Sequence, residues 1–466
     1  MMREYKRYEE YQDSGVEWIG EIPKAWNLIR FKYLFSYQKG NSPNEYVGKS
    51  EGIPYLSMDY LRGNNDEITY VSNDPNMIKV ENNQILLLWD GSNSGEFIKS
   101  KKGLLSSTMS LITDIKIDKE FSYHYFKSSE KYLKDQTIGM GIPHVDSKIL
   151  KNLHLSVPEK DEQQKIASFL DQKTAEIDEI ISKKETLIDH LEKFKKSVIT
   201  EAVTKGKLGD KYINKDGELV DEIEMKDSGI EWIDDVPNNW EVNYIKYYCS
   251  KITDGSHHSP AQQSEGRPYI TVRNIEENNI NFNSCSYLSE DNYNELVLSG
   301  CKPKSGDVLL SKDGTVGKVV IVNDNDFVVL SSIAILRPKS NNLLSNFLFY
   351  ILKSNYLENQ MNSFMAGAAI KRITITDINK FIIIVPQLNI QNEIINYLNK
   401  KTNQINNLIQ RTKESIEKYK EYKKSLIFEA VTGKIDLRDY ELEGGEELAE
   451  HNNSSETERE SISAVD

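Results

Sequence analysis

The chain has 466 residues, of which 38% are hydrophobic and 28% charged, a composition typical of a soluble protein with about three domains. Its three cysteines lack any C-x-x-C spacing, which argues against a disulfide framework or a zinc site and favours a reducing cytosol. The polar, charged start and the short apolar runs argue against a signal peptide and a membrane span, so we expect a cytoplasmic protein.

The net charge of −14 is concentrated at one end of the chain. From Asp439 onward, ten acidic residues face a single arginine, Arg459, so this stretch carries −9 of the total. Such a segment has little to bury, and we predict an acidic disordered tail over 438–466. The nearly neutral remainder can present local basic patches, but it should bind DNA weakly alone and depend on partners for much of the electrostatic attraction.

The sequence repeats itself. Asp13–Ile19 recurs as Asp227–Ile233, an offset of 214 residues. Further matches follow in the same order: Leu88–Ser92 with Ser311–Thr315 (offset 223), Ser106–Ser107 with Ser331–Ser332 (225), Val157–Pro158 with Val385–Pro386 (228), and Glu201–Thr204 with Glu429–Thr432 (228). The chain therefore consists of two copies of one unit of about 220 residues.

Each copy begins with a β-leaning globular segment, about 27–157 and 241–385. Its predicted strands are bounded by Asp-Gly and Asn-rich turns. The strand candidates include Ile85–Leu88, Lys318–Val322, Val328–Leu330 and Phe381–Val385. We interpret the repeated Asp90-Gly91 and Asp313-Gly314 pairs as hairpin turns.

Each copy ends in a long helix that starts just after Pro158 or Pro386 and ends at Gly206 or Gly433. Asp161 and Asn389 are the expected N-caps. Apolar residues recur at alternating steps of four and three, which indicates a coiled coil about 60 Å long. The predicted seam is Ile166, Leu170, Lys173, Ile177, Ile180, Lys184, Leu187, Leu191, Phe194 and Val198, matched by Ile394, Leu398, Lys401, Ile405, Leu408, Thr412, Ser415, Tyr419, Tyr422 and Leu426.

At this point the sequence resembles a known family. Asp13–Pro23, the segment from Val157-Pro158 to Gln163–Ile166, and the doubled Glu-Ala-Val-Thr resemble the specificity subunits of type I restriction–modification systems. The resemblance implies an α+β fold: two similar mixed α/β target-recognition domains, joined by two long helices that form an antiparallel coiled coil with a pseudo-twofold internal repeat. The expected domains are 1–157 (first target-recognition domain), 158–208 (first helix), 209–385 (second target-recognition domain), 386–437 (second helix) and 438–466 (tail).

The resemblance also implies the function. Each globular segment reads one half of a split, asymmetric sequence in double-stranded DNA, and the helices set the length of the unread spacer. They also dock two modification subunits, which use S-adenosylmethionine to methylate adenine N6, and two restriction subunits use ATP to translocate and cleave. S-adenosylmethionine, ATP and Mg are thus expected on the partners, and no cofactor on this chain.

Motifs for catalysis are missing from the sequence. There is no Pro-Pro pair for an adenine-methylase loop, and neither Gly-Lys pair has the glycine that a Walker A loop requires. His257-His258 with Asp254 could suggest a metal, but without a second ligand cluster a polar loop is the better interpretation. We predict a non-catalytic chain with no metal site.

Candidate DNA contacts are arginine, lysine, asparagine and histidine on probable loops, because these side chains read base edges or bind phosphates. They are Arg62, Asn64, Asn65, Lys99, Lys101 and Lys102 in the first copy, and His257, His258, Arg267, Arg273, Asn274, Lys312, Lys318, Lys371 and Arg372 in the second. Taken singly, each is more often a solvated surface residue than a DNA contact.

Two other classes of function are left open by the residues. A self-contained nuclease or methyltransferase would need the missing cofactor loops. A non-catalytic interaction protein, or an acidic DNA mimic, would be expected to spread its acidic residues over the globular segments instead of the tail. Within the leading class, the partners could be separate chains or a nuclease–methylase fusion.

Overall fold

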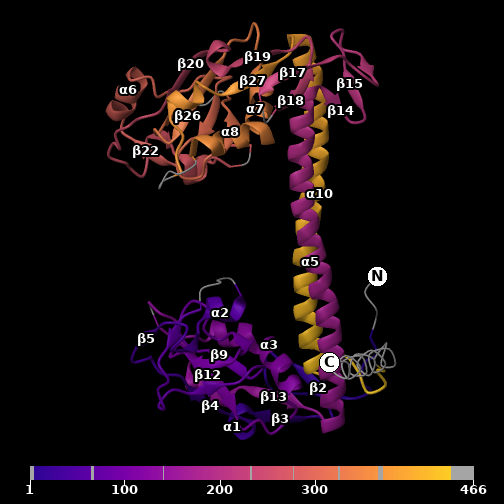
Figure 1. Cartoon of the computed structure of the whole chain (residues 1–466). Helices are drawn as coiled ribbons and strands as arrows, with labels where there is room; N and C mark the ends of the chain where they lie inside the picture. The colour runs from indigo at the N-terminus through magenta and orange to yellow at the C-terminus, as the bar shows by residue number, and fades with distance from the viewer. Residues whose placement is uncertain are drawn as a thin grey trace, which may run out of the picture. The chain divides into compact units, whose positions relative to one another are not determined.

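The computed structural model describes residues 5–63, 68–139, 141–230, 233–276, 278–323, 326–365 and 371–441. The chain forms two compact units: unit 1 is Met1–Lys183 with Ser415–Asp466, and unit 2 is Lys184–Glu414. Each unit contains a globular head and a stretch of both long helices (Figure 1). We call residues 5–157 the first head and 207–385 the second head.

The elements of unit 1 outside the long helices are short. Its strands are β1 (Tyr11–Asp13), β2 (Glu21–Pro23), β3 (Asn27–Arg30), β4 (Ser36–Lys39), β5 (Tyr46–Val47), β6 (Ile53–Leu56), β7 (Tyr70–Val71), β8 (Lys79–Val80), β9 (Ile85–Leu88), β10 (Phe97–Lys99), β11 (Gly103–Leu105), β12 (Met109–Thr113) and β13 (His154–Val157). Its helices are α1 (Phe31–Leu34), α2 (Met58–Arg62), α3 (Lys119–Asp135) and α4 (Ser147–Asn152).

The elements of unit 2 include a three-stranded sheet, β14-β15-β16, at its start. Its strands are β14 (Lys207–Leu208), β15 (Lys211–Ile213), β16 (Leu219–Val220), β17 (Met225–Ile230), β18 (Ile233–Pro237), β19 (Glu241–Tyr244), β20 (Cys249–Asp254), β21 (Arg267–Ile270), β22 (Ser286–Leu288), β23 (Val308–Ser311), β24 (Val319–Ile321), β25 (Val328–Val329), β26 (Ile333–Pro338) and β27 (Ile382–Val385). Its helices are η1 (Ile245–Tyr247), η2 (Val272–Asn274), η3 (Phe282–Ser284), α6 (Glu290–Leu298), α7 (Ser345–Leu352), α8 (Asn355–Met365) and α9 (Ile375–Ile378).

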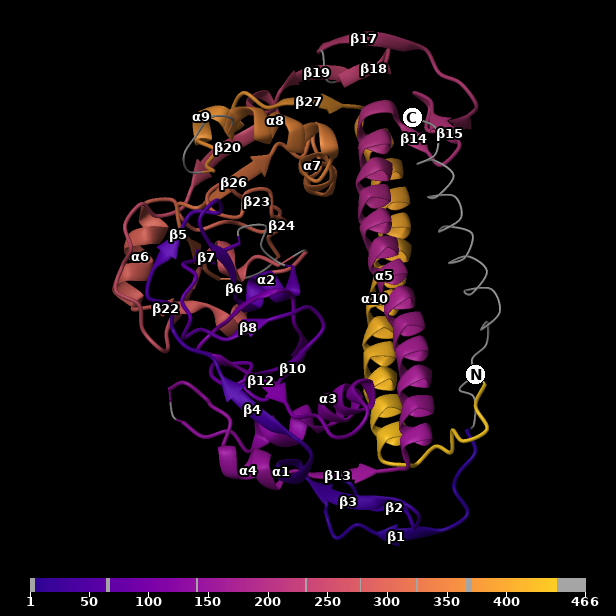
Figure 2. The same ribbon diagram turned by 60° about the horizontal axis from the view of Figure 1, so that its bottom comes forward.

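The sheets confirm the predicted internal repeat. Unit 1 has a four-stranded antiparallel sheet in the order β4-β12-β9-β10, and unit 2 has β20-β26-β23-β24. A parallel pair accompanies each sheet, β6 with β11 and β21 with β25. Figure 2 shows β13, β3, β2 and β1 in succession in unit 1, and β27, β19, β18 and β17 in unit 2.

Strand pairing corrects one part of the sequence alignment. Met109 lies opposite Leu88, and Ile333 lies opposite Ser311, so the offset at this strand is 224. Ser107 therefore corresponds to Ser331, and the predicted match of Ser106 with Ser331 is wrong by one residue. The sequence match was off by one because both copies contain two adjacent serines. The hydrogen bonds between the strands fix which residues of the two copies correspond.

The two long helices, α5 (Lys160–Lys205) and α10 (Leu388–Val431), pack antiparallel. In unit 1, Lys423 Nζ of α10 lies 2.6 Å from an Asp178 oxygen of α5. In unit 2, Lys195 Nζ of α5 lies 2.9 Å from Asn406 Oδ1 of α10. These two contacts correspond under the repeat offset of 228, so the pseudo-twofold extends to individual contacts.

Details of the helix prediction need correction. Asp161 and Asn389 lie inside the first turn, because the helices begin two residues earlier than these N-caps predict. Leu187, Phe194 and Leu408 of the predicted seam are 47–50% exposed. Ile405 is buried as predicted, but Ile409 and Ile416 are buried in place of the predicted Leu408 and Ser415, because the true seam shifts by one residue along this part of α10.

Both heads are built onto the helix ends. In unit 1 the core joins Phe169 of α5 and Val431 of α10 to aromatic residues of the first head such as Phe121. In unit 2 it joins Val203 of α5 and Leu398 of α10 to residues such as Phe347. Gly206 and Gly433 end the helices with φ of +62° and +72°, as predicted.

The first residues of the predicted acidic tail contact the folded part of unit 1. The Tyr440 ring lies 4.8 Å from the Phe169 ring, and its hydroxyl donates to Gln172 on α5. Tyr440 therefore packs against α5, because its ring has apolar surface to bury. The rest of the predicted tail, 442–466, lies outside the described residues. Across the described parts of the chain, no helix is both long and apolar enough to cross a membrane.

We predict that Gly40→Ala and Gly255→Ala each lower the free energy of unfolding by about 1–3 kcal/mol, as overpacking does. A Cβ at Gly40 would collide with the carbonyl oxygen of Ser106, and one at Gly255 with that of Val329. Denaturant titration measures the effect. Gly48→Ala is the matched control, since nothing lies within 4 Å of its added Cβ. Equal stability of all three variants would contradict this close approach.

Candidate nucleic-acid interface

In each unit, three segments far apart in sequence meet at one place, which we call the three-way junction. In unit 1 they are the end of β4, the connection that follows β9 and the segment before α4. In unit 2 they are the end of β20, the connection that follows β23 and the segment before α9. Trp89 N donates to Thr108 O at 2.8 Å and Val145 N to Trp89 O at 2.9 Å. In unit 2, Lys312 N donates to Ser332 O at 2.8 Å and Ile373 N to Lys312 O at 2.9 Å. The two backbones thus share one arrangement.

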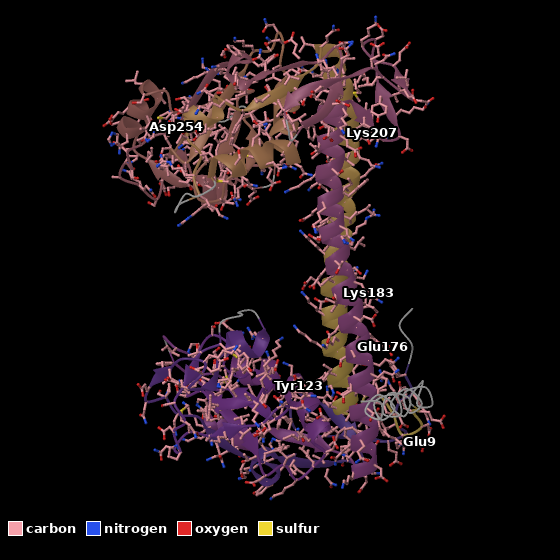
Figure 3. All side chains as sticks on the ribbon, viewed as in Figure 1. Glu9, Tyr123, Glu176, Lys183, Lys207 and Asp254 are labelled. Atoms are coloured by element: carbon pink, nitrogen blue, oxygen red, sulfur yellow. The ribbon has the colours of Figure 1, made fainter. Side chains whose placement is uncertain are left out.

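In unit 2 the junction carries a chain of alternating charges. The Lys312 side chain is 2% exposed, and its Nζ lies 3.3 Å from Asp254 and 3.2 Å from Asp313. The exposed His257 ring contacts Asp254 at 3.2 Å, and Arg372 Nε lies 3.1 Å from Asp313. Figure 3 labels Asp254 within the second head. A buried lysine therefore holds two carboxylates, each of which positions an exposed nitrogen-bearing side chain.

Unit 1 places different side chains on the same backbone. Pairing with β12 and β26 makes Lys39 the counterpart of Asp254. The isolated bridges of Asp90 with His144 and of Asp313 with Arg372 make His144 the counterpart of Arg372. Lys39 Nζ lies 2.9 Å from Asp90 and 5.8 Å from the centre of the Trp89 ring. Of the four side chains at the junction, only the aspartate after β9 or β23 is the same in both units.

The predicted contacts of the first head do not gather at its junction. Arg62 pairs with Glu96, on the connection that also carries Asp90. Lys99 pairs with Glu120 at 2.7 Å and lies over the Tyr123 ring, and Lys102 pairs with Glu81 at 3.1 Å. Lys101 donates to the Tyr60 carbonyl. Lys99 pairs with Ile85, the first residue of β9, so it lies at the open end of the β9–β10 hairpin. Lys99, Lys101 and Lys102 are therefore at the opposite end of this hairpin from Asp90, which lies in its turn. Asn64 and Asn65 lie outside the described residues.

Several predicted contacts of the second head have structural roles. Asn274 is 3% exposed, and its amide bonds Thr271 and Ser284, so the prediction that it reads a base needs correction. Lys312 is likewise interior, so it can position other groups but cannot reach DNA. Lys318 Nζ donates to the Ile275 carbonyl at 2.6 Å and holds η2 beside the hairpin.

Arg267 lies at the start of β21 and is bound by carboxylates. It contacts Glu290 at 2.8 Å and Asp326 at 2.7 Å. The hydrogen bonds that Arg267 donates to Glu290 lower the pKa of Glu290 and raise the pKa of Arg267. The guanidinium is therefore already paired on its own surface. His258, Arg273 and Lys371 are exposed, and Lys371 directly precedes Arg372 at the junction.

Sequence reasoning missed Lys39, Trp89 and His144 and interpreted Asp90 and Asp313 only as turn residues. Both aspartates do lie in hairpin connections, as predicted. The repeat offset of 228 already pairs His144 with Arg372, so comparing the copies position by position could have found this residue. Among the residues that the structure describes, no group of three or more His, Cys, Asp or Glu is placed to hold a metal ion.

Comparisons with known proteins agree with the repeat. A family model, the type I restriction modification DNA specificity domain, matches residues 23–190 and 237–418. The chain is 31% identical over 432 residues to the type I restriction enzyme MjaVIII specificity subunit of Methanocaldococcus jannaschii, covering 90% of this chain and 94% of that one. It is 22% identical over 422 residues to the EcoBI specificity subunit of Escherichia coli, covering 86% of each.

A solved structure has the same fold. It comes from work on complex assembly and conformational transition of a type I restriction–modification system. The TM-score is 0.63 at 16% sequence identity, over 89% of this chain and 99% of that one.

We predict that Lys312→Met lowers the free energy of unfolding by about 3 kcal/mol, the lower end of the cost of breaking a buried ion pair. The lower end applies because Asp254 and Asp313 are 15% and 26% exposed and keep some solvation. Lys371→Met, on the exposed neighbour of Arg372, should change stability by less than about 0.5 kcal/mol. Denaturant titration of both variants is the measurement, and a similar small effect for both would contradict the structural role of Lys312.

Proposed function

This chain belongs to the type I restriction–modification DNA specificity family, and we propose that each unit reads one half of a split DNA sequence at its three-way junction. One observation carries the assignment: the two junctions share their backbone hydrogen bonds but differ in side chains. A shared backbone arrangement that carries different side chains in the two units is suited to reading two half-sites of different sequence. The alternative of an interaction protein or acidic DNA mimic that reads no sequence is not favoured by this family membership.

In the second head, Arg372 and His257 are the proposed base-reading side chains. An arginine can donate two hydrogen bonds to guanine O6 and N7 in the major groove. Asp313 and Asp254 hold these side chains before DNA arrives, which reduces the entropy lost on binding. Lys371, Arg273 and His258, all exposed, are the proposed phosphate or flanking contacts.

In the first head, the proposed base-reading side chains are His144, the counterpart of Arg372, and Lys39, which occupies the position of Asp254. The Lys39 ammonium is held by Asp90 and lies beside the Trp89 ring, so it is oriented as Arg372 is in unit 2. Arg62 is bound through Glu96 to the β9–β10 connection, which also carries Asp90. We propose that Arg62 contacts the DNA phosphates next to the bases read at the junction. Lys99, Lys101 and Lys102 are proposed as weaker phosphate contacts, because each already bonds a group within the first head.

We assign all catalysis to partner subunits. Two modification subunits would bind S-adenosylmethionine and methylate the target, and two restriction subunits would use ATP and Mg to translocate and cleave. The family resemblance supports this division of labour. In this proposal α5 and α10 separate the two recognition domains, with the domain limits 1–157 and 209–385, and dock the modification subunits.

Methylome sequencing tests the assignment in cells that express this chain with its modification subunit. We predict a split, asymmetric motif that is absent when this chain alone is deleted. Changing Lys371 and Arg372 to glutamine should relax only one half of the motif, by about 1–3 kcal/mol per lost base contact. His144→Ala should relax only the other half.

The matched control is Lys304→Gln. Lys304 is an exposed lysine that precedes the start of β23, whereas the three-way junction lies just after the end of this strand. It should leave both half-sites unchanged. If the Lys371/Arg372 variant methylates the unchanged motif, and the salt dependence of DNA binding by the assembled complex is also unchanged, these two residues are not in the interface. Methylation that is identical with and without the chain would contradict the specificity role itself.

The helix pair allows a second test. Deleting 184–190 from α5 together with 411–417 from α10 removes one heptad from each while keeping the pairs Asp178–Lys423 and Lys195–Asn406 in register. Seven helical residues span about 10 Å, so we predict an unread spacer shorter by about three base pairs. The methylated motif reports the spacer directly. A spacer of the original length in a folded variant would contradict the ruler role, and the 184–190 deletion alone, which breaks the register, should abolish folding or methylation.

A further inference from the structure

Both heads carry the same exposed group of two lysines and a tyrosine, which we call the Lys–Tyr patch. It consists of Lys32, Tyr33 and Lys116 in unit 1 and of Lys246, Tyr247 and Lys339 in unit 2. Lys32 Nζ lies 5.0 Å from the centre of the Tyr33 ring, and Lys246 Nζ lies 5.1 Å from that of Tyr247.

The second lysine of each patch also makes the same contact. Lys116 Nζ donates to the Tyr33 carbonyl at 2.8 Å, and Lys339 Nζ donates to the Tyr247 carbonyl at 2.9 Å. The backbone bonds agree as well, since Lys116 N donates to Leu34 O and Lys339 N to Tyr248 O. Residues about 83 and 92 positions apart thus build one surface group twice.

Among the residues that the structure describes, none covers these tyrosines. Tyr33 is 58% exposed and Tyr247 54%, although both rings are large and apolar over their faces. In unit 2, Tyr244 adds a second ring, 42% exposed, with Lys246 over it at 5.2 Å. Exposed tyrosine rings are typical of protein-binding surfaces, where tyrosine is enriched.

The patch lies away from the reading site. In unit 1, β4 starts directly after α1 and the patch, and ends at Lys39 of the three-way junction. The same holds for β20, which starts after η1 and ends at Asp254. The two surfaces therefore occupy opposite ends of one strand in each head.

We propose that the Lys–Tyr patch docks a modification subunit together with the long helices, one copy on each unit, through an acidic surface of that subunit. The proposal rests on the proposed function, which supplies a partner that binds twice. Side chains that read two different half-sites must diverge, as those at the junctions do. Side chains that bind two copies of one partner must stay the same, as those of the patch do. The lysines favour carboxylates, and the rings supply apolar area.

The test uses the full-length chain and the purified modification subunit without DNA. The variants are Lys32→Glu with Tyr33→Ala, Lys246→Glu with Tyr247→Ala, and all four together. Titration calorimetry and native mass spectrometry then give affinity and stoichiometry. We expect each two-residue variant to bind one copy normally and the other at least tenfold more weakly, and the four-residue variant to bind both weakly.

Matched controls are Lys79→Glu and Lys304→Glu, exposed lysines elsewhere on the two heads. Both should bind two copies with the original affinity. Tyr33→Phe with Tyr247→Phe keeps the rings and should also bind normally, and an unchanged melting temperature shows that the variants fold.

Unchanged affinity for the four-residue variant would overturn the proposal. Normal partner binding with weaker DNA binding by the assembled complex would overturn it in favour of a phosphate contact. Because partner binding is measured without DNA, a failed methylome experiment and a failed docking experiment are distinguishable.

Discussion

The antiparallel packing of α5 against α10 is the interaction on which the rest of the structure depends. Each helix contributes one end to each hydrophobic core: Phe169 and Val203 belong to different cores, although both lie on α5. Neither head has a complete core without the helix that follows the other head in sequence. A shift in register between the helices would therefore disturb both cores at once, since the core contacts and the Asp178–Lys423 and Lys195–Asn406 pairs are set by the same alignment.

Much of the fold could be predicted because it is encoded by local patterns. The repeated segments, the long apolar stripes and the glycines at the helix ends indicated two heads and two helices. The seam was only partly right, because steps of four and three are ambiguous by one position wherever neighbouring residues are both apolar, as Leu408 and Ile409 are. The strand register after β11 was missed for a related reason: adjacent serines look alike in sequence, but hydrogen bonds distinguish them.

The candidate site was less predictable, since it is made by contacts between distant segments. Counting cations identified Lys99, Lys102 and Arg267, yet carboxylates from elsewhere in the chain bind all three. The same counting identified Arg372 and His257, which the structure brings to the two ends of one charge chain through Lys312. Lys39 and His144 carried no local signal. His144 could have been found from the repeat offset that pairs it with Arg372. Lys39 is recognised only when the hydrogen bonding of the two sheets is compared.

The division of the chain also has a consequence for its synthesis. Unit 2 is a continuous segment, 184–414, whereas unit 1 joins 1–183 to residues after 414. The first head to leave the ribosome is thus the last to be completed, because Leu426, Ile427 and Val431 of its core are made after the entire second head. At the elongation rates of cells, about 5–20 residues per second, the apolar face of the first head waits some tens of seconds for α10. Over that interval the nascent first half exposes a surface that suits a chaperone or the same half of another copy, so assembly of this protein is most vulnerable before its second repeat is finished.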